Sequence, residues 1–224
     1  MNAKKNKLIT FSMVISLTAG IFIFYSIQEE TSLPQWLSGI ITILSSVAFY
    51  QLLIGIFYFV GNHSDFLLKI FWEKTYLKGF WSYTYMLDGQ KQYGVWVIDQ
   101  DIDEINIKGF GLSKNGRRSD VQSISPLIKR GVDYEITNMR RDVNEDGTWS
   151  DVYFYSKTNL HLISRKTFLG LFNYPLEMDG TTTVYGGSLS GKNHSSLKFE
   201  KHPNVKNERE IEHKIIQTLK EQGD

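Results

Sequence analysis

The residues best suited to chemistry in this chain are tyrosines that recur at alternate positions. Tyr83 and Tyr85 are two residues apart in one strand-like segment, and Tyr153 and Tyr155 repeat that spacing later in the chain. Alternate residues of a strand share a face, so each pair presents two rings and two hydroxyls to one side. Such a surface suits a ligand with planar bases and phosphate oxygens, although ordinary core packing also produces aromatic stripes.

A guanidinium and a hydroxyl complete the candidate ligand-binding set. Arg165 lies in an apolar run where alternation points either it or Lys166 toward a side that could be interior. A guanidinium inside a barrel needs an anion from the protein or from a ligand. We therefore expect Tyr83, Tyr85, Tyr153, Tyr155, Arg165 and Thr182 to bind a ligand, with rings stacking on bases and with Arg165 and hydroxyls contacting phosphates. Trp81 is interpreted as a structural plug of the barrel.

Other basic pairs and short motifs favour structural interpretations. The pairs Arg117-Arg118, Lys129-Arg130 and Arg140-Arg141 are interpreted mainly as solvated surface charge. Residues 186–192 resemble a phosphate-binding loop, but Asn193 replaces the magnesium-binding hydroxyl and no helix is expected to follow. Residues 142–147 resemble the start of a calcium loop, but Tyr153 stands where its bidentate glutamate is needed. These two segments are interpreted as turns.

The sequence offers no positive sign of catalysis or of metal binding. The five histidines show no ligand spacing, and no serine or threonine lies in a nucleophile elbow. We therefore predict a binding protein rather than an enzyme, with no metal and no cofactor apart from an activating ligand.

Charge and cysteine content limit the partners and the compartment. The 224 residues contain 25 Lys+Arg and 24 Asp+Glu, a formal net charge of +1. This balance leaves no excess of positive charge of the kind that binds a DNA or RNA polymer. The absence of cysteine fits a reducing cytoplasm without proving it.

Two uncharged stretches near the N-terminus are long enough to cross a bilayer as helices. They are residues 8–27 and 37–60, and together residues 1–63 are predicted to form an antiparallel transmembrane hairpin. A cleaved signal peptide is the alternative for the first stretch, but its apolar core is too long and no cleavage site follows it. Lysines flank the hairpin and none lies in its connection, which predicts that both termini are cytoplasmic.

The rest of the chain changes to strand-like patterning. Residues 64–78 have helical spacing and are predicted to form an interfacial linker helix. Residues 79–203 show period-2 alternation with turn signals, which predicts a compact antiparallel barrel of about eight strands. The strands are expected at residues 80–87, 93–98, 102–110, 121–124, 132–139, 149–156, 160–168, 181–187 and 195–201, with one turn at Asp179-Gly180. Residues 204–224 are predicted to form a helix that covers an end of the barrel or a loosely held tail.

Short motifs give the chain a resemblance to a known family. Gly79 and Trp81 match the Gly-x-Trp signature of lipocalin-like barrels, within the segment KGFWSY. With the preceding hairpin and the later segment IKGFGLS, the chain resembles the two-transmembrane, β-strand-rich effectors of bacterial CBASS antiphage systems. The resemblance implies an inner-membrane protein whose cytosolic barrel binds a cyclic oligonucleotide made by a partner nucleotidyltransferase.

The resemblance also implies an output at the membrane. Ligand binding would drive homo-oligomerisation of the hairpins, disruption of the bilayer, and growth arrest or cell death. Two helices alone cannot enclose a pore, so several copies are needed. Two rival interpretations stay open: a membrane-tethered lipocalin-like carrier of an apolar ligand, and a scaffold whose barrel has a filled core.

Overall fold

A computed structural model gives the structure of the chain and describes residues 2–30, 33–87, 90–144, 147–166, 173–185 and 193–221. The chain divides into two compact units, Met1–Phe71 and Trp72–Asp224, so the first unit extends beyond the predicted hairpin. Each unit is described by itself.

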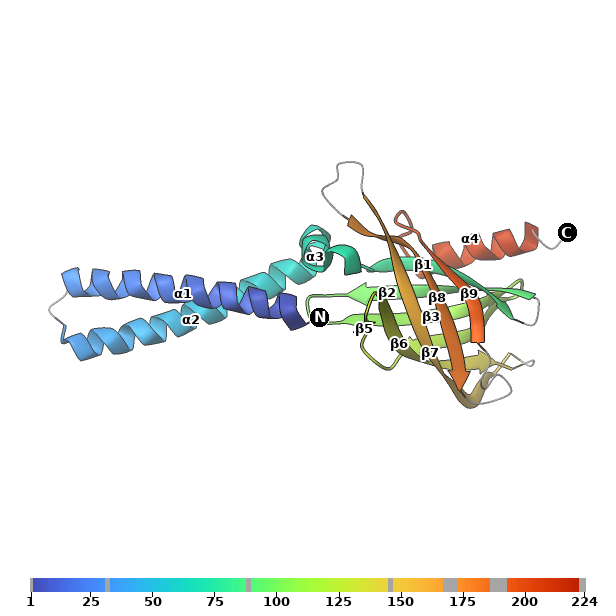
Figure 1. Ribbon diagram of the computed structural model, residues 1–224, viewed down its shortest axis with the longest axis horizontal. Helices are drawn as coiled ribbons and strands as arrows, with labels where there is room; N and C mark the ends of the chain where they lie inside the picture. The colour runs from blue at the N-terminus through green and yellow to red at the C-terminus, as the bar shows by residue number, and fades with distance from the viewer. Residues whose placement is uncertain are drawn as a thin grey trace. The chain divides into compact units, whose positions relative to one another are not determined.

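The first unit is an antiparallel pair of long helices, α1 (Asn2–Glu30) and α2 (Gln35–His63) (Figure 1). Within them, the segments Ile9–Glu29 and Gln35–His63 have mean hydropathies of 1.8 and 2.1 and are long and apolar enough to cross a membrane. Each helix is longer than the stretch predicted from the uncharged residues. The reason is that polar residues at both ends continue the helical hydrogen bonding.

Small side chains mediate the contact between α1 and α2. Gly20 lies against Ser46 and Thr42, and a Cβ added at Gly20 would overlap the Ser46 hydroxyl. By contrast, a Cβ at Gly39 or at Gly55 meets no atom within 4 Å in the described part of the chain. Close packing of α1 against α2 therefore requires a small residue at Gly20.

A short helix follows the hairpin, as predicted. Helix α3 (Asp65–Trp72) begins after Ser64, whose side-chain Oγ accepts a hydrogen bond from the Leu67 N–H at 3.4 Å. A 3-10 turn, η1 (Glu73–Thr75), follows at the start of the second unit.

The second unit is a closed, antiparallel, up-and-down β-barrel (Figure 1). Its strands are β1 (Gly79–Leu87), β2 (Gln90–Gln100), β3 (Ile105–Ser113), β4 (Gly116–Ser123), β5 (Ile128–Arg130), β6 (Asp133–Val143), β7 (Trp149–Lys166), β8 (Asn173–Tyr185) and β9 (Asn193–Lys201). Pairing of β1 with β9 and of β4 with β6 closes eight of these strands into the barrel. The short β5 only extends the edge of β6. The predicted barrel is confirmed.

Strands β7 and β8 differ from the prediction. β7 runs without a break through residues predicted as a gap, and β8 contains Asp179-Gly180, which was predicted as a turn and is not one. The gap in β7 was predicted because Thr158 is polar yet faces the interior, so the apolar and polar residues do not alternate there. The turn in β8 was predicted wrongly because Gly180 serves close packing: its added Cβ would clash with the Asn159 carbonyl.

One end of the barrel is closed by an aromatic and amide cluster. Trp81 is fully buried and donates from its indole N–H to the Leu77 carbonyl at 2.7 Å. The Gln100 side chain accepts from the Leu77 N–H at 2.7 Å and donates to the Thr75 carbonyl at 3.0 Å. Lys201 lies here too, with its ammonium 4.5 Å from the Tyr76 ring centroid. Trp81 thus occupies the place expected of a plug.

Helix α4 (Glu208–Glu221) packs on the outer wall of the barrel. Ile211 and Ile215 are buried in one cluster with the outward-facing side chains Tyr93, Val95, Phe110 and Leu112. The expectation that this helix covers a barrel end, or is loose, is wrong. Outward positions of β2 and β3 are apolar and need a cover, which the amphipathic helix provides.

Candidate functional site

The structure separates the six predicted site residues into three groups. Tyr83, Tyr85 and Thr182 line a cavity inside the barrel. Tyr153 and Tyr155 lie on the outer wall, with 44% and 47% of their surfaces exposed. The Arg165 side chain lies outside the described residues. The expected set is therefore not one cluster.

A glycine on the neighbouring strand makes room for the interior Tyr83. Tyr83 on β1 pairs with Gly94 on β2, and a Cβ at Gly94 would overlap the Tyr83 ring. The Tyr83 and Tyr85 rings lie nearly parallel, with centroids 6.1 Å apart and an interplanar angle of 21°. Burial, and then the neighbouring Tyr85, raise the pKa of Tyr83, so its phenol stays protonated at physiological pH.

Two arginines converge on the Tyr85 hydroxyl. Arg118 donates to it from Nη2 at 3.2 Å, and Arg140 from Nη1 at 3.5 Å. Arg140 also donates from Nε to the Asp142 carboxylate at 2.5 Å. We call Tyr85, Arg118, Arg140 and Asp142 the interior arginine cluster.

Positive charge exceeds negative charge in the interior arginine cluster. Asp142 pairs with the guanidinium of Arg140, and no ion pair to Arg118 is found among the described residues. Burial lowers the pKa of Arg140, but Tyr85 and Asp142 outweigh it, so the pKa lies above its ordinary value and the charge persists. The Nε of Arg118 is buried and has no hydrogen-bond acceptor in the described part of the chain. Such an arrangement attracts an anion.

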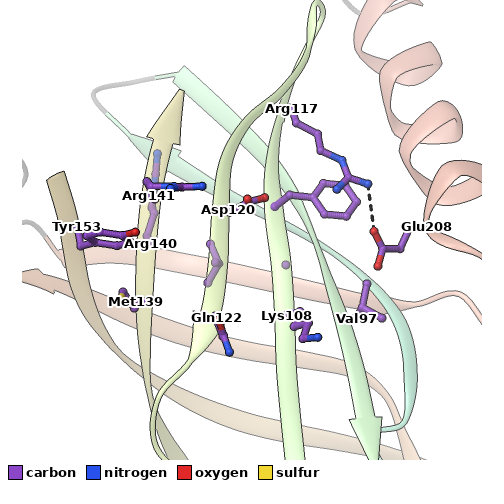
Figure 2. Close-up of a pocket in the computed structure, with 13 residues that line it drawn as sticks. Val97, Lys108, Arg117, Asp120, Gln122, Met139, Arg140, Arg141, Tyr153 and Glu208 are labelled. Atoms are coloured by element: carbon purple, nitrogen blue, oxygen red, sulfur yellow. Dashed lines mark hydrogen bonds and ion pairs between the residues drawn. The ribbon is translucent and has the colours of Figure 1, made fainter. Parts of the chain in front are cut away.

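A β-bulge on β4 turns Arg118 into the barrel. Gly111 pairs with Ser119 while Leu112 pairs with Arg117, so Arg118 is an extra residue on its strand. Because of this extra residue, the neighbouring Arg117 points to the outer wall (Figure 2). The Ser119 hydroxyl, next to the bulge, accepts a hydrogen bond from the Gly111 N–H at 3.1 Å. Bulges commonly redirect a side chain in this way.

The interior cavity has a polar side and an apolar side. Its volume is about 60 Å³. Asn138 is 1% exposed, donates to the Thr158 hydroxyl at 3.3 Å, and leaves its carbonyl oxygen without a donor in the described part of the chain. The Thr158 and Thr182 hydroxyls are 2.8 Å apart. The space suits water or a single phosphate-sized group, whereas sites for whole small molecules measure roughly 300–1,000 Å³.

The outer wall carries a larger groove, of about 340 Å³, between α4 and the β6 and β7 strands (Figure 2). Arg117 spans from β4 to α4, with ion pairs of 3.1 Å to Glu208 and 2.9 Å to Glu212. Arg141 lies over the Trp149 ring, 4.8 Å from its centroid, and 5.9 Å from that of Tyr153. The lining of this groove contains four basic residues and two acidic ones, and the Arg117 guanidinium is already paired with Glu208 and Glu212.

Sequence reasoning missed the two interior arginines. The pairs Arg117-Arg118 and Arg140-Arg141 were interpreted as surface charge. That interpretation is wrong for Arg118, whose Nε is buried, and for Arg140, whose side chain is 21% exposed. Strict alternation along β6 could have found Arg140, because it shares a face with the buried Ile136 and Asn138. No such signal exists for Arg118, because the bulge breaks the alternation.

The remaining motifs concern histidines, acidic side chains and a glycine-rich segment. Among the described residues, no group of three histidine or acidic side chains could hold a metal ion. His161 pairs with Asp133 at 2.9 Å on the surface. The phosphate-loop-like segment 186–192 lies outside the described residues.

The fold and site define a class: a closed β-barrel with a charged interior site, preceded by two helices long and apolar enough to span a membrane. Comparisons of the chain with protein-family models, curated proteins and solved structures find no match.

Proposed function

We propose that this protein is a membrane effector switched by a cyclic oligonucleotide that binds in the barrel. The interior arginine cluster carries this proposal, because Arg118 and Arg140 converge on the Tyr85 hydroxyl, Asp142 pairs with Arg140, and Arg118 Nε lacks an acceptor in the described part of the chain. A ligand phosphate would supply the missing negative charge and the missing acceptor. The resemblance to two-transmembrane CBASS effectors supports the same choice of ligand.

The stacked tyrosines supply the second element of recognition. A phosphate held by Arg118 and Arg140 lies beside Tyr85, whose ring is parallel to that of Tyr83. A base next to this phosphate could stack on an aromatic ring. The cavity of about 60 Å³ is smaller than a nucleotide, so binding of the whole ligand requires Tyr85 and the arginines to move apart.

In the proposed effector, the apolar hairpin is the part that acts on the membrane. We place it in the bacterial inner membrane with both termini in the cytoplasm, because lysines flank the hairpin and are absent from its connection. Ligand binding must favour an oligomer, since two helices cannot enclose a pore. Several copies would then disrupt the bilayer and arrest growth.

A thermal-shift experiment tests the proposal directly. The full-length protein in detergent would be heated with a panel of cyclic di- and trinucleotides and with fatty acids. A ligand that binds only the folded state at about 100 times its Kd stabilises it by about 2.7 kcal/mol, which raises Tm measurably. We expect a rise with at least one cyclic nucleotide; no rise with any of them would refute the proposal.

A carrier of an apolar ligand is the second candidate. Trp96, Leu197 and Phe199 line the apolar side of the same cavity. The variant Arg118→Gln distinguishes the two functions, because it removes the anion contact and leaves the apolar lining unchanged. A carrier would retain binding of an uncharged apolar ligand such as a fatty alcohol in this variant, whereas the proposed effector would lose nucleotide binding.

A further inference from the structure

Arg117 and Arg118 are adjacent on β4 but act on opposite sides of the barrel wall. Arg118 reaches inward to the Tyr85 hydroxyl, and Arg117 reaches outward to α4. One peptide bond joins the two residues. Which arginine enters the barrel therefore depends on where the β4 bulge lies.

The position of the bulge is not fixed by the arginines themselves. Moving the extra residue by one position would exchange the faces of Arg117 and Arg118, because side chains alternate along a strand. Both residues carry the same side chain, so their intrinsic preferences are equal. Contacts that differ between the two faces must decide the register.

The outer wall provides those contacts for Arg117. Its guanidinium lies 3.8 Å from the Phe110 ring centroid and pairs with Glu208 and Glu212, one turn apart on α4. Ile211 and Ile215, on the same helix, are buried against the barrel and hold α4 in place. Figure 2 shows Arg117 directed at Glu208 across the gap between β4 and the helix. We call Arg117, Glu208 and Glu212 the α4 clamp.

We propose that the α4 clamp positions Arg118 for anion binding inside the barrel. Holding Arg117 on the outer wall fixes the bulge, and the fixed bulge keeps Arg118 directed at the ligand. The clamp touches no ligand and lines no part of the interior cavity, so Arg117, Glu208 and Glu212 are positioning residues. This inference rests on the proposed function, because it concerns the same interior site.

Loss of the clamp should weaken binding without changing the interior residues. The full-length protein in detergent would be titrated with inorganic pyrophosphate, as a probe of the anion site, and with cyclic di-AMP and cyclic di-GMP. We expect Arg117→Ala and the pair Glu208→Gln with Glu212→Gln each to raise Kd by about fivefold or more, the lower end of typical coupling between sites. Arg130→Ala serves as the control, because this arginine is 66% exposed on β5.

A rescue separates positioning from general destabilisation. Arg117→Glu combined with Glu208→Arg and Glu212→Arg rebuilds the ion pairs with reversed charges, but not the Phe110 contact, and should recover part of the affinity that Arg117→Ala loses. Thermal unfolding of each variant identifies any that fails to fold. The Glu208→Gln, Glu212→Gln pair leaves β4 unchanged and keeps the test valid if Arg117→Ala unfolds.

The outcomes distinguish this inference from the proposed function. If Arg118→Gln loses binding while the clamp variants bind as the wild type does, the positioning role is wrong and the interior site stands. If the wild type binds none of the probes, both the site and the clamp's role in it are overturned.

Discussion

The space and the charge around a position in the barrel explain which residue occupies it. Gly94 is glycine because the Tyr83 ring occupies the position of its side chain. Asn138 and Thr158 are polar in a buried layer and bond to each other. Arg118 and Arg140 both donate to the Tyr85 hydroxyl, and Arg140 also pairs with Asp142. The residue scale thus accounts for both the packing of the interior and its attraction for anions.

Substitution of Gly94 by alanine should destabilise the barrel. The new methyl group must displace the buried Tyr83 ring, and overpacking of this kind typically costs about 1–3 kcal/mol. Chemical denaturation of the variant measures the change in unfolding free energy. Lys198→Ala, at an exposed position of β9, is the control and should be close to neutral. Equal stability of the two variants would contradict the packing described here.

His202 should make stability depend on pH. Its Nε2 lies 2.8 Å from the Ser82 hydroxyl, and burial, followed by the charge of Lys214, lowers its pKa, while Glu200 opposes this. The folded state therefore disfavours the protonated ring. The associated stability is complete above the unfolded pKa of about 6.5 and declines as pH falls toward the lowered folded value.

Thermal unfolding between about pH 7.5 and about pH 5 measures this effect. We expect Tm of the wild type to fall more steeply toward low pH than that of His202→Gln. His213→Gln removes an exposed histidine of α4 and serves as the control. A wild-type slope equal to that of His202→Gln would contradict the role of His202.

At the scale of elements, one wall of the barrel depends on helix α4. The helix buries Ile211 and Ile215 against outward apolar residues of β2 and β3. Its acidic residues Glu208 and Glu212 hold Arg117 and thereby the β4 bulge. The same element therefore covers an apolar surface and stabilises the strand that carries Arg118.

Truncation of the buried face of α4 should release the helix before the barrel unfolds. Ile211→Ala removes a fully buried side chain and should cost about 2–5 kcal/mol. Hydrogen exchange should then increase in residues 208–221 far more than in β7 and β8. Uniform acceleration across the barrel would instead mean that α4 and the strands unfold together.

Sequence patterns predicted the elements better than they predicted the site. Alternation and turn signals identified a barrel, because most inward residues are apolar and most turns contain glycine. They divided β7 in two because Thr158 is a buried polar residue. They placed Tyr83 and Tyr85 together correctly on an inward face. They could not place Arg118, because a single bulge, determined by contacts with a helix about 90 residues later, reverses the alternation.

At the scale of the whole molecule, the chain joins an apolar helical hairpin to a barrel with a charged interior site. The hairpin packs through Gly20 and Ser46, and its helices are long and apolar enough to span a membrane. The barrel presents two guanidinium groups to its interior. In the proposed function, the barrel binds the signal and the hairpin acts on the bilayer.

The orientation of the hairpin gives a prediction at this scale. Lysines at both ends of the hairpin and none in its connection predict that the connection faces away from the cytoplasm. The chain contains no cysteine, so single cysteines can be introduced without background. In intact spheroplasts, a membrane-impermeant maleimide should label Leu33→Cys and spare Asn204→Cys until the cells are lysed. Labelling of Asn204→Cys before lysis would place the barrel outside the cytoplasm.

The central claim is that Arg118 holds an anionic ligand inside the barrel. Thermal unfolding of the full-length wild type and of Arg118→Gln, each with and without the panel of cyclic nucleotides, tests it most directly. We predict that at least one cyclic nucleotide raises Tm of the wild type and leaves that of Arg118→Gln unchanged. An equal rise in both proteins would move the binding site away from Arg118, and no rise in either would contradict the proposed ligand.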